Sequence, residues 1–159
     1  MTVQKRARFK NVFLVFFCVF VALFSWQRVE ASDYDHYNPI EKDASSTGFE
    51  TLQQLNHDVC GWISLDGTKV DYPLLQSQDN VKYLDRNAFG DYTITGSIFL
   101  DYRFNPNFTD FNTIIYGHSM ASGAMFGEIK KFADKEFFDQ HRYGSIYYNG
   151  RERGLEIFG

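Results

Sequence analysis

Hydrophobic and polar positions divide the chain into an apolar segment near its start and a longer part with short alternating patterns. Residues 12–26 form an uninterrupted apolar run, with basic residues before it and acidic residues after it. From residue 47 onward, apolar residues recur within stretches of about four to eight residues, which is typical of half-buried β-strands. The pattern predicts a mainly β domain with short helices, behind an N-terminal hydrophobic segment.

Two dipeptides predict β-hairpins, because Asp-Gly and Asn-Gly readily adopt the positive φ angles of tight turns. Phe49, Leu52 and Leu55 give a preceding helix one apolar face. The predicted hairpins are 59–65 with 68–75 around Asp66-Gly67, and 145–148 with 151–158 around Asn149-Gly150. The other predicted elements are a helix over 47–55, a helical turn within 79–87, strands over 95–100 and 113–116, and an amphipathic helix over 126–133 that is interrupted near Asp134.

The N-terminal segment predicts a single-pass membrane anchor. Basic residues precede the apolar run, so the positive-inside rule puts the N-terminus in the cytoplasm and the domain outside the cell. The run is short for a bilayer-spanning helix, which needs about 20 residues, and cleavage as a signal peptide stays open. We predict a basic cytoplasmic segment over 1–11, a signal-anchor or transmembrane helix over 12–28, an irregular extracellular linker over 29–46 and the folded domain over 47–159.

Charge and cysteine content exclude some classes of partner and site for this domain. The net charge is −4, and the basic cluster before residue 32 makes the rest of the chain more acidic still. Because the domain has no basic patch, nucleic acid is not expected as a partner. Cys60 is the only cysteine outside the apolar run, so no disulfide, metal site or cofactor is predicted, and we interpret Cys60 as a small buried hydrophobe.

The segment from Asn112 to Phe126 contains His118, the side chain that is the strongest candidate for acid/base chemistry. Residues 113–116 are β-branched or aromatic, and Gly117 and His118 then begin a run of small residues that permits a tight turn. An imidazole at the end of a strand is held by the sheet, and histidine titrates nearest to neutral pH. Residue type alone leaves a purely structural histidine open as the alternative.

Tyr-Gly-His-Ser-Met at 116–120, followed by Gly-Ala-Met-Phe at 123–126, resembles the catalytic-histidine segment of class B sortases. The match is collinear from Phe49 to the last residue. Four further segments resemble family motifs in the same order. Residues 58–63 resemble the Asp-x-x-Gly-Trp-Ile opening, and residues 67–73 resemble the Gly-Thr-x-Ile-Asp-Tyr-Pro strand. Residues 79–84 resemble the Asn-x-x-Tyr-Leu turn, and residues 96–102 resemble the Gly-Ser-Ile-Phe-x-Asp segment.

The resemblance implies a sortase-like antiparallel β-barrel and a cysteine transpeptidase. Such an enzyme cleaves a C-terminal sorting signal and joins the surface protein or pilin to an amine of peptidoglycan or of another pilin. His118 matches the acid/base histidine, and Asn80, Leu84 and Tyr116 match positions that line the substrate groove. The family's nucleophile, in a Thr-Leu-x-Thr-Cys-type motif, and its arginine have no match here, so we expect a barrel incomplete at the C-terminus and a chain that is inactive alone.

Two other functions stay open at this point. The first is a non-catalytic, surface-displayed module that binds a peptide in the same groove. The second is a metal-dependent hydrolase that uses His118 with Asp101, although the chain has no His-x-x-x-His spacing. Peptide binding without covalent capture would favour the module over the enzyme.

Overall fold

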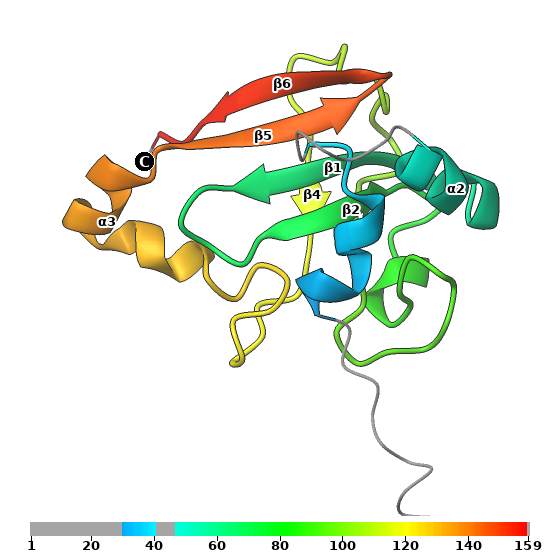
Figure 1. Cartoon of the computed structure of the whole chain (residues 1–159), viewed down its shortest axis with the longest axis horizontal. Helices are drawn as coiled ribbons and strands as arrows, with labels where there is room; N and C mark the ends of the chain where they lie inside the picture. The colour runs from blue at the N-terminus through cyan, green and yellow to red at the C-terminus, as the bar shows by residue number, and fades with distance from the viewer. Residues whose placement is uncertain (1–29, 41–46, 159) are drawn as a thin grey trace, which may run out of the picture.

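The computed structural model describes residues 30–40 and 47–158, and within them six strands form one sheet in the order β4-β3-β2-β1-β5-β6 (Figure 1). Neighbouring strands are antiparallel except for β2 and β3, which are parallel. The mainly β prediction is confirmed. The sheet is mixed, not purely antiparallel as the family resemblance implied, because β2 and β3 are parallel. The strands β4 and β6 form its two ends. The strands are β1 (Val59–Leu65), β2 (Asp71–Leu75), β3 (Ile98–Leu100), β4 (Ile115–Tyr116), β5 (Tyr143–Tyr148) and β6 (Arg151–Glu156).

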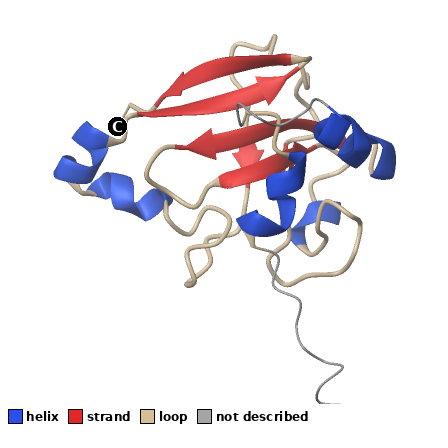
Figure 2. Ribbon diagram, in the orientation of Figure 1, coloured by secondary structure: helices blue, strands red, loops and turns tan. Residues whose placement is uncertain are grey.

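Short helices lie at both ends of the sheet and below it in the view of Figure 2, and α2 and α3 lie at opposite ends of it in Figure 1. The predicted helix over 47–55 is confirmed as α2. The predicted break near Asp134 is also confirmed, because the Asp134 carboxylate accepts a hydrogen bond from the Phe137 amide at 2.9 Å and caps α3. The helices are η1 (Ala31–Tyr37), α2 (Thr47–Leu55), η2 (Lys82–Leu84), η3 (Ile129–Ala133) and α3 (Lys135–Gln140), where η denotes a 3-10 helix.

Both hairpins form, with different turns. In β5–β6, Asn149 and Gly150 have φ angles of 49° and 71°, as the tight turn requires. The β1–β2 turn is longer than predicted, so that β2 begins at Asp71. The reason is Thr68, whose hydroxyl donates to the Leu65 carbonyl and accepts from the Val70 amide, which extends the loop.

The core lies where β1 and β2 pack against the first helices. Trp62 is fully buried, and its indole N–H donates to the Asp71 carboxylate at 2.6 Å. Leu52 is fully buried on α2, whereas Leu55 is 62% exposed. The predicted apolar face was therefore wrong for Leu55, because it lies about 120° around the helix axis from Phe49 at 3.6 residues per turn.

Residues 31–37 correct the prediction of an irregular linker. They form η1, and the Tyr34 side chain is 1% exposed within the core. The Tyr34 hydroxyl accepts a hydrogen bond from the Ala88 amide at 3.2 Å, and its ring stacks on Phe89 with 5.4 Å between centroids. A tyrosine with both an apolar and a polar partner makes this segment part of the domain.

The predicted membrane anchor at 12–28 lies outside the described residues. Among residues 30–40 and 47–158, none of the helices has both the length and the apolar character needed to cross a bilayer.

Candidate active site

His118 lies just beyond the end of β4, and the chain after it folds back against it. β4 pairs with β3 through Phe99 with Tyr116 and Leu100 with Ile115. The Phe126 amide donates to the His118 carbonyl at 2.8 Å, which closes the turn. At Gly117 a Cβ atom would lie 2.7 Å from the Phe126 ring, so a glycine permits this close approach.

The imidazole of His118 is half-buried and bonded to the last residue of η2, Leu84. Its Nε2 lies 2.8 Å from the Leu84 carbonyl oxygen. A carbonyl oxygen can only accept, so Nε2 carries the proton and the neutral ring has its lone pair on Nδ1. The contact therefore selects one tautomer and leaves Nδ1 for proton transfer.

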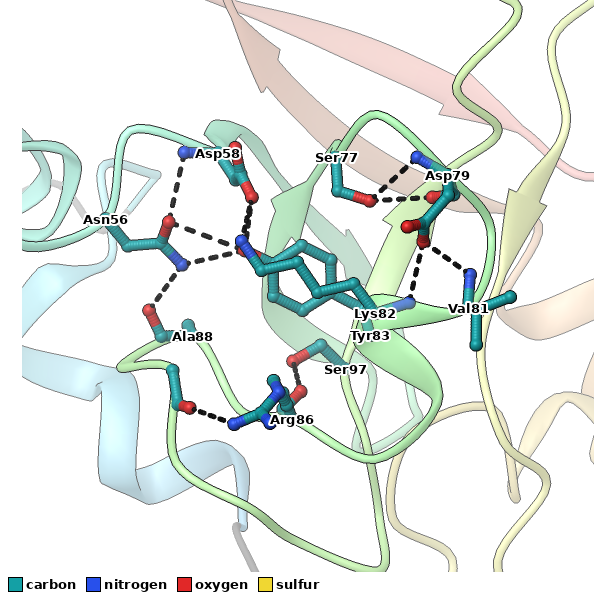
Figure 3. A network of polar contacts seen from close by, with 11 residues as sticks. Asn56, Asp58, Ser77, Asp79, Val81, Lys82, Tyr83, Arg86, Ala88 and Ser97 are labelled. Carbon is teal, nitrogen blue, oxygen red and sulfur yellow. Dashed lines mark hydrogen bonds and ion pairs between the residues drawn. The ribbon is translucent and has the colours of Figure 1, made fainter.

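Polar contacts hold the segment 79–84 that supplies this carbonyl (Figure 3). The Asp79 carboxylate accepts from the amides of Val81 and Lys82, each at 2.8 Å. These two N–H groups, that of Lys82 first, lower the pKa of Asp79. The Asp58 carboxylate binds the Lys82 ammonium at 2.6 Å and the Tyr83 hydroxyl at 2.8 Å. The turn is thereby tied to the start of β1.

Gly96 supports the same turn from the side of β3. Its φ angle is 58°, and a Cβ atom there would lie 2.6 Å from the carbonyl oxygens of both Tyr83 and Leu84. The Ser97 amide donates to the Tyr83 carbonyl at 3.0 Å. Only glycine satisfies both the left-handed backbone and this close contact without strain.

The buried carboxylate of Asp101, directly after β3, joins two predicted groove residues. Arg103 contacts it with two nitrogens, Nε to Oδ1 at 2.9 Å and Nη2 to Oδ2 at 2.7 Å. Asn80 Nδ2 and the Tyr116 hydroxyl donate to Oδ2 at 2.9 and 3.0 Å. The Arg103 guanidinium in particular holds the pKa of Asp101 well below its usual range, and the hydrogen bond to Asp101 raises the pKa of Tyr116.

The predicted site residues thus form two pairs, Asn80 with Tyr116 on Asp101, and His118 with the Leu84 carbonyl. The Leu84 side chain is 43% exposed, so it is open to a ligand. Sequence reasoning missed the roles of Asp101 and Gly96. Both residues lie in the segment 96–102 that resembles a family motif, which marked them without indicating their roles.

The Asp101 carboxylate forms an ion pair, which the metal-dependent hydrolase interpretation did not predict. A metal-dependent hydrolase would use its carboxylate as a ligand, but here the carboxylate is ion-paired with Arg103. Among the described residues, no group of three or more His, Cys, Asp or Glu side chains could hold a metal ion.

Cys60 has the environment of a packing residue. It is half-buried against the core, and its thiol donates to the Leu74 carbonyl at 3.4 Å. Burial raises the pKa of the Cys60 thiol to about 12, so that it stays protonated at neutral pH. A nucleophilic cysteine requires the opposite shift.

Comparison with known proteins identifies relatives of this chain in sequence and in fold. Sortase B of Listeria monocytogenes is 44% identical over 125 residues, which make up 74% of this chain and 51% of that relative. Sortase B from Bacillus anthracis has 35% identity and a TM-score of 0.72, over 92% of this chain and 68% of that structure. The chain belongs to the sortase B family.

Other comparisons define the extent of this sortase B relationship. A Staphylococcus aureus sortase B–substrate complex gives a TM-score of 0.70 at 28% identity, over 81% of this chain and 60% of that structure. No family model matches the chain. The chain spans 51% and 38% of the lengths of the Listeria and Staphylococcus sortase B relatives that it matches in sequence.

Proposed function

We propose that this chain supplies the acid/base histidine and part of the peptide groove of a cysteine transpeptidase that cleaves a sorting signal and transfers the surface protein or pilin to an amine. The observation that carries the proposal is the 2.8 Å contact between His118 Nε2 and the Leu84 carbonyl. It joins the candidate catalytic ring to a residue of the candidate groove and leaves the ring's Nδ1 as its proton-transfer atom.

In this reaction a cysteine thiolate attacks the scissile carbonyl carbon. The tetrahedral intermediate collapses, the C–N bond breaks, and imidazolium Nδ1–H of His118 gives its proton to the departing amine. An acceptor amine then attacks the thioacyl carbon, its proton returns to Nδ1, and the thiolate leaves. The Nε2–H bond to Leu84 persists through both steps, so the ring keeps one orientation.

The groove part of the proposal concerns Asn80, Leu84 and Tyr116. Asn80 and Tyr116 can hydrogen-bond an extended peptide, and Leu84 offers an apolar wall that is 43% exposed. The Staphylococcus aureus sortase B–substrate complex supports a groove in this fold, since that relative binds a substrate. Placement of the domain outside the cell, with a membrane anchor at 12–28 and peptidoglycan or a pilin as the acceptor, belongs to the same proposal.

A chimera tests the catalytic assignment, because the 159 residues contain no match to the family's cysteine and arginine motifs. The whole chain is joined to the part of the Listeria sortase B sequence that follows the matched region. We expect the chain alone to bind a sorting-signal peptide of that relative without turnover, and the chimera to cleave a fluorogenic form of it. His118→Ala should lower kcat/KM of the chimera by about 10²–10⁴-fold.

The matched control is His36→Ala, at an exposed histidine on η1, which should leave turnover unchanged. Unchanged turnover in the His118→Ala chimera would refute the acid/base role. A folded chimera that binds the peptide but never forms a thioacyl adduct would favour the non-catalytic binding module instead.

A further inference from the structure

We propose that Asp101 is a positioning residue that assigns opposite hydrogen-bonding roles to two groove side chains, making Asn80 a donor and Tyr116 an acceptor toward the backbone of a bound peptide. The inference rests on the proposed function, because it takes both side chains to face a peptide. Its evidence is the set of contacts around one buried carboxylate.

The orientation of the Asn80 amide is determined from both of its ends. Nδ2 donates to Asp101 Oδ2 at 2.9 Å, and Oδ1 accepts from the Tyr102 amide at 3.1 Å. A flipped amide would place its oxygen against the carboxylate and its NH₂ group against the Tyr102 N–H, so both contacts would become repulsive. One N–H of Nδ2 is used by Asp101, and the other is left for a ligand carbonyl.

The Tyr116 hydroxyl, unlike the Asn80 amide, can only accept a further hydrogen bond. A phenol has one proton, and this proton points to Asp101 Oδ2 at 3.0 Å. The carboxylate cannot donate in return, because its two-point pairing with Arg103 keeps it ionised. The Tyr116 oxygen therefore has only lone pairs to offer, which suits a peptide N–H.

Asp101 is held firmly enough to impose these roles. Its side chain is fully buried, and its amide donates to the Ile114 carbonyl at 2.9 Å, next to β4. Gln76 Nε2 donates to the Asp101 carbonyl at 3.0 Å, and the Arg103 amide donates to Oδ1 at 3.0 Å. The carboxylate is thus fixed from several sides, and a fixed acceptor preorganises the donors that it binds.

A donor and an acceptor presented together suit an extended backbone, in which each peptide unit has one N–H and one C=O. The substrate class is therefore an extended peptide that this part of the groove reads through its backbone. Selection among side chains would fall to other walls of the groove, such as Leu84.

The first test needs no peptide and uses NMR of the full 159-residue chain in detergent micelles. With ¹⁵N-labelled asparagine, the Asn80 side-chain protons of the wild type should exchange slowly with solvent, and Asp101→Asn should make them exchange at least about 10-fold faster. With ¹³Cζ-labelled tyrosine, Asp101→Asn should lower the pKa of Tyr116, because the carboxylate that raises it is gone.

The matched control is Asp139→Asn, which makes the same chemical change in an exposed ion pair with Lys135 on α3. It should alter neither signal. Unchanged Asn80 exchange together with an unchanged Tyr116 titration in Asp101→Asn would overturn the proposal. If that variant fails to fold, the wild-type spectrum decides, because Asn80 side-chain protons that exchange with solvent as fast as those of an exposed asparagine would also overturn it.

The second test measures peptide affinity by fluorescence anisotropy. The probe is a sorting-signal peptide of the Listeria relative, with a series of analogues in which each backbone N–H is replaced in turn by an ester oxygen. One analogue should bind the wild type about 3–10-fold more weakly than the parent peptide, as expected for one lost hydrogen bond. Tyr116→Phe should bind this analogue and the parent peptide equally well.

Affinity losses that are the same in wild type and Tyr116→Phe for every ester analogue would refute the acceptor role of Tyr116. A wild-type chain that binds no peptide at all would count against the proposed function, whereas the peptide-free NMR signature decides the role of Asp101 separately. The two failures are therefore distinguishable.

Discussion

The Leu84 carbonyl oxygen has two close neighbours, the Nε2 atom of His118 and the backbone at Gly96. The hydrogen bond from His118 Nε2 to this oxygen is 2.8 Å long. Gly96 has a φ angle of 58°, and a Cβ atom at this position would lie 2.6 Å from the same oxygen. Gly96, two residues before β3, thereby influences the position of the imidazole through the Leu84 carbonyl.

Gly96→Ala is expected to weaken both the fold and the His118 contact. The alanine would adopt a left-handed backbone and press against two carbonyl oxygens, with a cost in the free energy of unfolding of about 1–3 kcal/mol. Urea denaturation measures this loss. In ¹⁵N spectra of the histidine rings, the wild type should show His118 with its proton on Nε2, and the variant should show a mixture of tautomers.

Gly154→Ala is the matched control, because no atom lies within 4 Å of a Cβ at this exposed strand position. It should change neither stability nor the His118 spectrum appreciably. Equal effects of the two substitutions would show that the Gly96 contact has no special role.

At this scale, the family motifs indicated roles for some residues but not for residues that act through tertiary contacts. His118, Asn80, Leu84 and Tyr116 were chosen because each matches a family motif. Asp101 also lies in a family motif, but the motif did not indicate its role, since its partners Asn80 and Tyr116 are 21 and 15 residues away along the chain. Only the fold brings these three side chains together.

At the scale of elements, the sequence predicted those turns and helix ends that neighbouring residues determine. The Asn149-Gly150 turn and the helix interruption near Asp134 are set by neighbouring residues, and both were predicted. η1 was missed because its sequence is polar and acidic apart from its tyrosines. One of these, Tyr34, is 1% exposed because residues far along the chain, among them Tyr72, Ala88 and Phe89, lie against it.

Two leucines of α2 make an element-scale prediction. Leu52 is fully buried, whereas Leu55 is 62% exposed at the end of the same helix. Leu52→Ala should lower the free energy of unfolding by about 2–5 kcal/mol through the cavity that it leaves. Leu55→Ala should change it by less than about 0.5 kcal/mol. Chemical denaturation of both variants measures the difference, and similar losses would contradict the observed packing of α2.

At the scale of the whole molecule, the strands differ in how much of the structure holds them. β1 pairs with both β2 and β5, and most of its side chains are buried. Among the strands that the structure describes, β6 has β5 as its single neighbour, and five of its six residues are exposed. Its exposed charges, Arg151, Glu152, Arg153 and Glu156, discourage pairing with a second chain at this edge.

Hydrogen exchange should follow this difference across the sheet. Opening β6 exposes little apolar surface and breaks one set of ladder bonds, whereas opening β1 breaks two sets and exposes the core around Trp62. We therefore expect β1 amides to exchange only through global unfolding and β6 amides to exchange at least about 10-fold faster, as in a locally opening unit. Amide exchange of the full chain, followed by NMR, measures both rates. Leu52→Ala should accelerate β1 exchange and leave β6 exchange nearly unchanged, because only β1 reports global stability. Equal protection of the two strands would instead show that the β5–β6 hairpin unfolds together with the core.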